Sequence, residues 1–521
     1  MTIAPIAAPA STAAIRSFIG SRRRRRWFDW YFIAFATVLA VILASDLLAE
    51  PFRRLTAPPG SSSPPQAVAG AGLVIVAAAG LLAAAQALGP LALSPADASW
   101  LLLSPLDRRD VLRRPTSTAA ALAAFAGGVL GALALAMAGP YLRPGGHGMP
   151  WAWLVLAALS GAGFFLAAVL AAVLAQPWAR LRAGLRAACA GVSLAAAGCA
   201  VAGERWSAMS RAITGAFAHL STGALGVTAA VAVAAACAAT LLVRRMLPRF
   251  PAAILRAQSA RASTVLMAAW MANLPLLTWM AEDSHWRGRL LASRPWPRLA
   301  PAFALAWADW RRLARRPGAL VVLAGSTLAP ALAGTAVTGH ARGQVTAAVL
   351  LAGGIVAGTL GTAGARRDTN DPTLRRLLGV TPGAALAARA ALPALLSAAW
   401  LTLALALLVP AGVLSGWLWP LLGPAAGPGL AAAALRIART APINPAERGP
   451  DTPLGPAPPW LVTREFSVLV GLAGCYPALK AVVAGHVHAA TFTAQVAFSG
   501  VVLGGYLLLS ASRRPALRVV R

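Results

Sequence analysis

Very few ionisable side chains lie inside the long apolar stretches of this sequence. The chain's only lysine, Lys480, lies in the apolar segment PALKAVV, and Asp46 lies at the end of an apolar stretch near the N-terminus. A charge at mid-bilayer costs about 2.5–3.5 kcal/mol, so such groups often mark an ion or substrate path. Lys480 and Asp46 are therefore candidates for a transport path. The alternative for Lys480 is that its long side chain reaches the nearer membrane surface.

The sequence lacks the motif with which such a chain would bind ATP by itself. A P-loop requires Gly-x-x-x-x-Gly-Lys-Ser/Thr, whereas Lys480 follows a leucine and precedes an alanine. The six histidines and four cysteines do not have the spacing of a metal site. We therefore expect no catalytic residue, no metal and no cofactor in this chain. ATP and Mg²⁺ would act only through a partner ATPase.

The composition is that of an α-helical membrane protein. Hydrophobic residues make up 58% of the 521, charged residues only 12%, and the mean hydropathy is +0.68, whereas a soluble chain carries about 25% charged residues. The short alternating segments of a β-barrel are not found. We predict an all-α polytopic fold with about 12 transmembrane helices. The predicted spans are 28–48, 67–93, 116–139, 151–175, 183–203, 223–243, 318–338, 344–365, 389–410, 418–437, 466–485 and 490–511.

The distribution of arginine predicts the orientation of these spans. With the N-terminus inside, 39 arginines fall in cytoplasmic segments and 6 in outer loops, as the positive-inside rule requires. This accounts for the net charge of +31 without a nucleic-acid partner. We expect a multi-pass protein of the inner (plasma) membrane with both termini cytoplasmic. A thirteenth apolar stretch lies at 262–281. If it crossed the membrane, it would reverse the orientation of all spans in the second half, so we interpret it as interfacial or packed against a partner.

Three landmarks recur along the chain in the same order. The segment WFDW at Trp27 returns as WADW at Trp307, and RRMLP at Arg244 returns as RRP at Arg513. Between them, the prolines Pro95 and Pro105 correspond to Pro372 and Pro382. We therefore predict two parallel six-span repeats. Their ranges would be 1–250 and 307–521, joined by a cytoplasmic or interfacial linker at 251–306.

A proline-punctuated basic segment lies between the second and third predicted spans. At 94–115, Ser-Pro-x-Asp occurs twice, which predicts two short helices, and Pro115 would end the second. The related segment is 371–388. Either segment could lie on anionic lipid, or it could dock a cytoplasmic partner, which the repetition and the stiffness favour. The candidate contact residues are Trp100, Leu101, Leu102, Leu103, Asp107, Arg108, Arg109, Arg375, Arg376, Leu377 and Leu378.

The stretch LLLSPLDRRDVLRR and the six-span layout resemble the ABC-2 type transporter permeases. The proline-rich stretch RTAPINPAERGPDTPLGPAPPW is similar to a loop of actinobacterial membrane proteins described as ABC transporter-associated. The resemblance implies an exporter permease whose coupling helices, at the two segments just described, fit an ATP-binding-cassette subunit. Two ATPase copies, membrane lipids and a second permease chain would be the partners. Two halves fused in one chain depart from the commonest pattern. A secondary transporter, or a polytopic membrane enzyme, is the alternative function.

Overall fold

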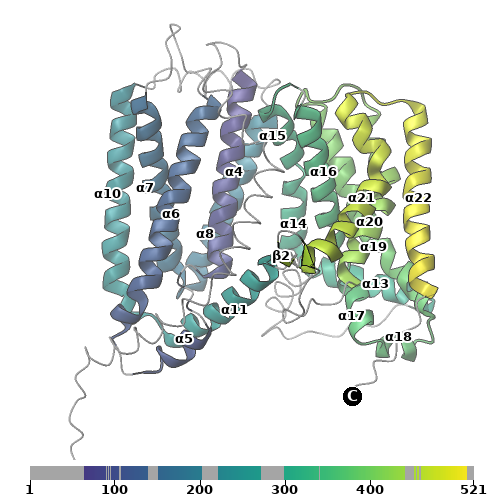
Figure 1. Ribbon diagram of the computed structural model, residues 1–521, viewed down its shortest axis with the longest axis horizontal. Coiled ribbons are helices and arrows are strands. Elements are labelled where there is room, and N and C mark those ends of the chain that lie inside the picture. The colour runs from purple at the N-terminus through teal and green to yellow at the C-terminus, as the bar shows by residue number, and fades with distance from the viewer. Residues whose placement is uncertain are drawn as a thin grey trace, which may run out of the picture. The chain divides into compact units, whose positions relative to one another are not determined.

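The computed structural model describes residues 64–138, 151–201, 221–270, 298–439 and 451–512, apart from a few loop positions (Figure 1). These residues fall into two compact units, one with most of α4 to α11 and the other with α13 to α22. The helices of the first are α4 (Pro64–Leu88), α5 (Pro95–Trp100), α6 (Arg108–Ala138), α7 (Trp151–Ala175), α8 (Ala179–Val201), α10 (Thr222–Met246), the 3-10 turn η2 (Leu247–Arg249) and α11 (Ala252–Trp270).

The second unit begins with α13 (Pro301–Ala314), α14 (Pro317–Ser326), α15 (Ala329–Ala336), α16 (Ala341–Thr359), α17 (Ala363–Asn370) and α18 (Thr373–Leu377). It continues with α19 (Pro382–Leu408), η3 (Trp419–Leu421), α20 (Leu422–Arg439), α21 (Pro459–Ala484) and α22 (Ala489–Ser512). Two residue pairs, β1 (Asp451–Thr452) and β2 (Gly455–Pro456), form a minimal antiparallel ladder.

The protein is an all-α polytopic membrane protein. Ten helical segments of the described chain are long and apolar enough to cross a bilayer, and they coincide with ten of the twelve predicted spans. The prediction at 28–48 lies outside the described residues, as does most of the proline-rich loop. The prediction at 183–203 coincides with α8, which is not among the ten. Its first two turns carry Arg180, Arg182 and Arg186.

Small residues let the helices of the first unit approach closely. Helix α7 packs against α6 on one side and α10 on the other. Gly127 and Gly131 of α6 meet the backbone of α7 at Gly161 and Ala157. A Cβ on any of these three glycines would collide with the facing backbone, so Gly127 and Gly131 form a close Gly-x-x-x-G contact between the two helices.

Replacing Gly161 by leucine is expected to destabilise the first unit by at least the 1–3 kcal/mol typical of overpacking, because the facing atoms are backbone and cannot move aside. Gly500→Leu on α22 is the matched control, because a Cβ there meets nothing within 4 Å. Thermal unfolding of the purified protein in detergent measures both. An equal loss for the two variants would contradict the assigned contact.

The second unit is built around α20, which contacts α16, α19, α21 and α22. Its span is 72% buried, the highest share among the ten. Trp400 of α19 and Trp419 of η3 are buried within the same apolar core. Gly354 and Gly358 of α16 pack against Leu430 and Ser397, whereas Gly500 and Gly504 of α22 face open space.

One predicted span is divided into two helices. The predicted span 318–338 coincides with the candidate span Pro317–Ala336, but it consists of two helices, because α14 ends at Ser326 and α15 begins at Ala329. Pro330 has no N–H for an intrahelical hydrogen bond, and hydroxyl groups bind the freed backbone. Ser326 Oγ donates to the Leu323 carbonyl oxygen, and Trp400 Nε1 donates to Ser326 Oγ, both over less than 3 Å. The break is therefore a fixed feature of this unit.

Candidate functional site

Each unit has one short helix directly before a long span, and we call these segments the first tip (Pro95–Asp107) and the second tip (Asp371–Thr381). In the first tip, α5 extends into a helical turn, since Leu101 N donates to the Asp97 carbonyl at 2.8 Å and Ser104 N to the Trp100 carbonyl at 3.1 Å. Asp107 then caps α6, because its carboxylate accepts from Arg109 N at 2.9 Å. Successive caps leave this segment little conformational freedom.

The four candidate apolar residues of the first tip do not share one face. Trp100 is 79% exposed and Leu103 is 64% exposed, and Leu101 is half-buried. Leu102 is only 5% exposed, because it packs in the unit's own core with Leu112 and Phe250. The prediction that Leu102 lies on the docking surface is therefore wrong in this geometry.

The arginines of the first tip also differ in their surroundings. Arg108 Nη1 donates to the Phe250 carbonyl at 2.9 Å, which ties the start of α6 to the end of η2. Arg109 and Asp107 are exposed. Of the candidate charged residues, Arg109 and Asp107 are thus available at the surface, and Arg108 has a role within the unit.

The predicted end of a helix at Pro115 is wrong. Helix α6 starts at Arg108 and continues through Pro115 to Ala138. Hydroxyl groups after the proline bind neighbouring carbonyls, Thr116 Oγ1 to Leu112 at 2.6 Å and Thr118 Oγ1 to Arg114 at 3.0 Å. The start of α6 is therefore continuous with the helix of the following span.

The second tip is a capped turn. Asp371 accepts a hydrogen bond from Thr373 N at 3.0 Å, and the bonds from Thr373 lower the pKa of the Asp371 carboxyl. At its other end, Gly379 has φ +65°, and Val380 N donates to the Arg375 carbonyl, which is a Schellman motif. Thr381 then caps α19 by accepting from Ala384 N at 3.3 Å, as the Thr-Pro pair predicts.

The second tip also exposes apolar side chains. Leu377 is 80% exposed and Leu374, which the sequence analysis missed, is 48% exposed. Arg376 is exposed, and Arg375 and Leu378 are half-buried. Both tips thus present a large apolar side chain on a short, capped helix outside the ten candidate spans.

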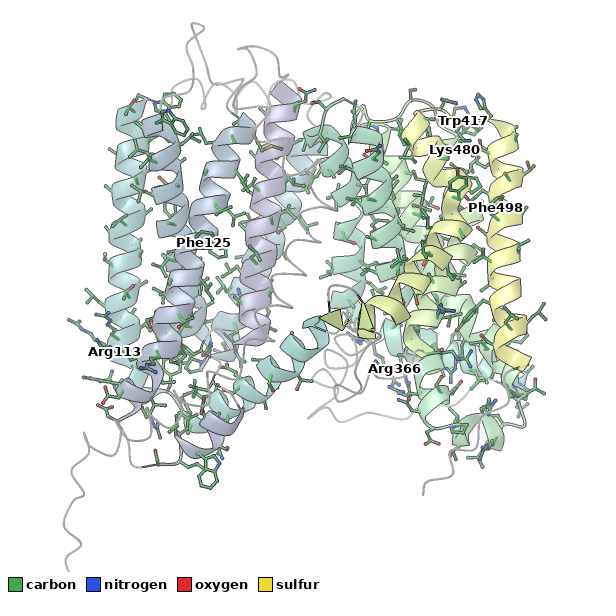
Figure 2. All side chains as sticks on the ribbon, in the orientation of Figure 1. Arg113, Phe125, Arg366, Trp417, Lys480 and Phe498 are labelled. Atoms are coloured by element: carbon green, nitrogen blue, oxygen red, sulfur yellow. The ribbon has the colours of Figure 1, made fainter. Side chains whose placement is uncertain are left out.

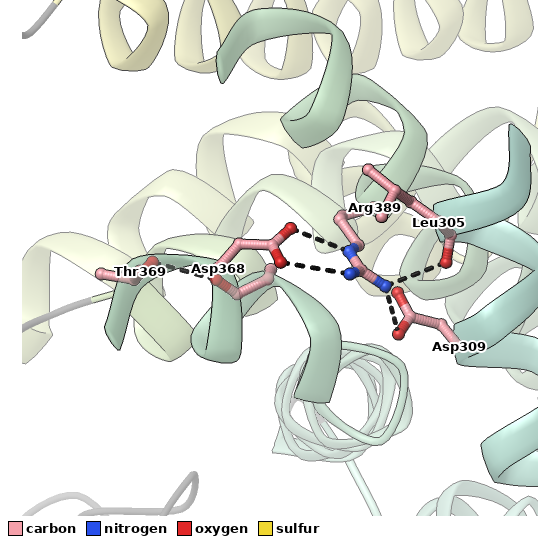
Figure 3. A network of polar contacts seen from close by, with 6 residues as sticks. Leu305, Asp309, Asp368, Thr369 and Arg389 are labelled. Carbon is pink, nitrogen blue, oxygen red and sulfur yellow. Dashed lines mark hydrogen bonds and ion pairs between the residues drawn. The ribbon is translucent and has the colours of Figure 1, made fainter. Parts of the chain in front are cut away.

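A buried ion network lies at the base of the second tip (Figure 3). Arg389 of α19 donates to Asp368 of α17 through Nε at 3.0 Å and Nη2 at 3.2 Å. Its Nη1 donates to Asp309 of α13 at 2.7 Å and to the Leu305 carbonyl at 2.9 Å. One guanidinium thus joins three helices, α13, α17 and α19. Two of them, α17 and α19, flank the second tip.

Close backbone approach permits this network. A Cβ at Gly364 would collide with Asp309 and with the guanidinium of Arg389. The side chains of Arg389 and Asp309 are 4% and 3% exposed, and Asp309 Oδ2 has no hydrogen-bond partner among the described residues. Burial raises the pKa of Asp309 to about 6, although Arg389 opposes the rise.

The sequence analysis missed Asp309, Asp368 and Arg389. The sequence does indicate these residues. The chain has only 15 acidic residues, and one of them, Asp309, lies in the recurring WADW segment. Arg389 also falls on the first position of a predicted span. An arginine at that depth requires partners, and a search for nearby acidic residues would have found them.

The transport-path candidates lie elsewhere. Lys480 is exposed on α21, at the opposite end of the second unit from Arg366 (Figure 2). Its side chain does not enter the buried interior of this unit, which agrees with the alternative that it reaches the nearer membrane surface. Asp46 lies outside the described residues. Among the described residues, no group of three or more His, Cys, Asp or Glu side chains could hold a metal ion.

The raised pKa of Asp309 predicts a specific pH dependence. Because the folded-state pKa, about 6, exceeds the ordinary value of 3.8, the folded protein binds this proton more tightly than the unfolded chain does. The Asp309 contribution to the free energy of unfolding therefore falls as the pH rises from about 4 to about 6. Asp309→Asn should remove this decline in thermal unfolding scans. Asp371→Asn, whose carboxyl has a lowered pKa, should instead lose stability at neutral pH, and equal profiles would contradict the assignment.

A family model described as a family of unknown function, DUF6297, matches residues 65–444. The matched range includes both tips and the three members of the ion network. No curated protein and no solved structure matches the chain.

Proposed function

The chain belongs to DUF6297, a family of unknown function, and we propose from its own geometry that it is the permease subunit of an ABC-type exporter. A separate ATP-binding subunit drives it through the two tips. The observation that carries this proposal is the pair of capped tips with exposed apolar side chains, Trp100 and Leu103 on one and Leu374 and Leu377 on the other. A subunit driven from outside needs such rigid contact points.

The ion network supports a mechanical role for the second tip. The tip is held between α17 and α19, and Arg389 links both helices to α13. A displacement of the tip by a partner is therefore passed directly to a span of 27 residues, α19. An anchor that only rests on lipid would gain nothing from this buried connection.

The charge distribution supports a cytoplasmic position for the tips, where ATP is available. Arginine concentrates in the tips and at the adjacent helix ends, and such residues stay on the cytoplasmic side of the inner membrane. One tip in each unit favours two ATPase copies for each chain. The substrate path would then run through the spans that the tips control.

We further propose that the two units descend from one six-span repeat. The offset of 277 residues that relates Pro95 to Pro372 places Leu91 and Leu112 at the positions of Asp368 and Arg389. Both leucines are fully buried in one apolar cluster. A leucine pair in the first repeat would thus occupy the positions of an ion pair in the second. Replacing a buried ion pair by well-packed apolar residues often costs no stability.

Photo-crosslinking in native membranes tests the proposed function. A crosslinking amino acid at position 100 or 377 should capture the same P-loop ATPase, identified by mass spectrometry, and the complex should hydrolyse ATP. The same probe at position 480, at the other end of the second unit, is the control. Capture of no ATPase from either tip, with no ATP-dependent transport by the purified protein, would overturn the proposal and favour secondary transport.

A further inference from the structure

Helix α13 has a partly exposed aromatic face. Phe303 is 70% exposed, Trp307 37% and Trp310 43%, and their spacing places them on one side of the helix. The opposite side is buried through Leu305, Asp309 and Leu313. The helix is not one of the ten candidate spans, and the span of α14 begins directly after it at Pro317. Exposed tryptophan beside a span start is typical of a helix that lies in the membrane interface.

The end of this helix is strongly basic. Arg311 and Arg312 lie in its last turn, and Arg315 and Arg316 follow before Pro317. Four arginines at the level where a span enters the bilayer match the negative charge of phospholipid headgroups. Two acidic groups of this unit, Asp309 and Asp368, are paired with Arg389.

A hollow lies between the end of α13 and the end of α16. Two of its wall residues are the half-buried arginines Arg312 and Arg316, and the others include Asp309, Leu360, Gly361 and Ala363. Two guanidinium groups that line one hollow can bind the oxygens of one phosphate group. Asp309 also lines the hollow, but its Oδ2 is buried, so the two arginines supply the contacts to the phosphate.

We propose that this hollow binds the headgroup of an anionic phospholipid, with the phosphate held by Arg312 and Arg316. The aromatic face of α13 contacts the acyl-chain region beside it. The site goes beyond the proposed transport function, because it requires no ATPase. Because Asp309 lines the hollow and pairs with Arg389, lipid bound there would lie next to the ion network.

Lipid binding to the purified full-length protein tests this site. Short-chain phosphatidylglycerol and phosphatidylcholine would be titrated in detergent, with bound lipid counted by native mass spectrometry. We expect the wild-type protein to bind phosphatidylglycerol at least about tenfold more tightly than phosphatidylcholine, because only the former carries a net negative charge. The double variant Arg312→Gln and Arg316→Gln should lose this preference. Ala363→Leu, which fills the hollow without changing charge, should lose it as well.

The matched control is the double variant Arg113→Gln and Arg114→Gln, which removes the same charge from exposed positions of α6. It should retain the preference for phosphatidylglycerol. An equal loss in this control, or no preference in the wild-type protein, would overturn the site. Competition by water-soluble glycerol phosphate at equal concentration would instead identify a free phosphate ester as the ligand and reject the lipid. None of these readouts depends on ATP, so they fail or succeed separately from the proposed function.

Discussion

Arg389→Leu is expected to destabilise the second unit by about 3–5 kcal/mol, the typical cost of removing one partner from a buried ion pair. The substitution removes the guanidinium that pairs with both Asp309 and Asp368, and it removes the donor to the Leu305 carbonyl. Denaturant or thermal unfolding of the detergent-solubilised protein measures the loss.

Two further variants separate the ion network from general effects of charge. Arg376→Leu removes a similar charge from an exposed position of the second tip, and it should change stability by less than about 1 kcal/mol. The triple variant that also replaces Asp309 and Asp368 by leucine should recover most of the lost stability, because no buried charge is then left unpaired. A single Arg389 variant as stable as Arg376→Leu would contradict the network as described.

Much of the architecture could be predicted from the sequence, because long apolar stretches and arginine placement respond to the membrane itself. The spans at 151–175 and 490–511 follow directly from hydropathy. The division at Ser326–Ala329 could not be predicted this way, because the Ser326 hydroxyl that donates to the Leu323 carbonyl itself accepts a hydrogen bond from Trp400, which is distant in the sequence. Helix α6 likewise continues through Pro115 because local threonines bind neighbouring carbonyls.

The candidate site was predicted less completely. Proline and cap residues located both tips, since caps are local chemistry. Which leucine faces outward depends on tertiary packing, so Leu102 was placed on the surface although it belongs to the core with Leu112. The ion network depends on three segments separated by up to 80 residues, and the sequence indicated it only through Asp309 in the recurring WADW segment and through Arg389 at a span boundary.

The second prediction with a large expected effect concerns the exposed apolar side chains of the two tips. Trp100→Asp and Leu377→Asp each place a carboxylate on a side chain that is about four-fifths exposed. Neither side chain supports the core, so the unfolding temperature should stay close to that of the wild-type protein. In an interface with the ATPase, each would be a central apolar anchor, and the loss of one such anchor costs at least about 2 kcal/mol, or roughly 30-fold in affinity.

Co-purification of the ATPase and its stimulated ATP hydrolysis should therefore fall in both variants, whereas Trp100→Phe and Leu377→Met should retain them. Leu102→Asp serves as the contrasting case, because it buries a charge beside Leu112 and should lower the unfolding temperature as well. If Trp100→Asp and Leu377→Asp bind the ATPase as the wild-type protein does and lose only their affinity for anionic vesicles, the tips are lipid contacts. A loss of ATPase binding with unchanged stability has no such explanation, since lipid anchoring does not depend on a partner.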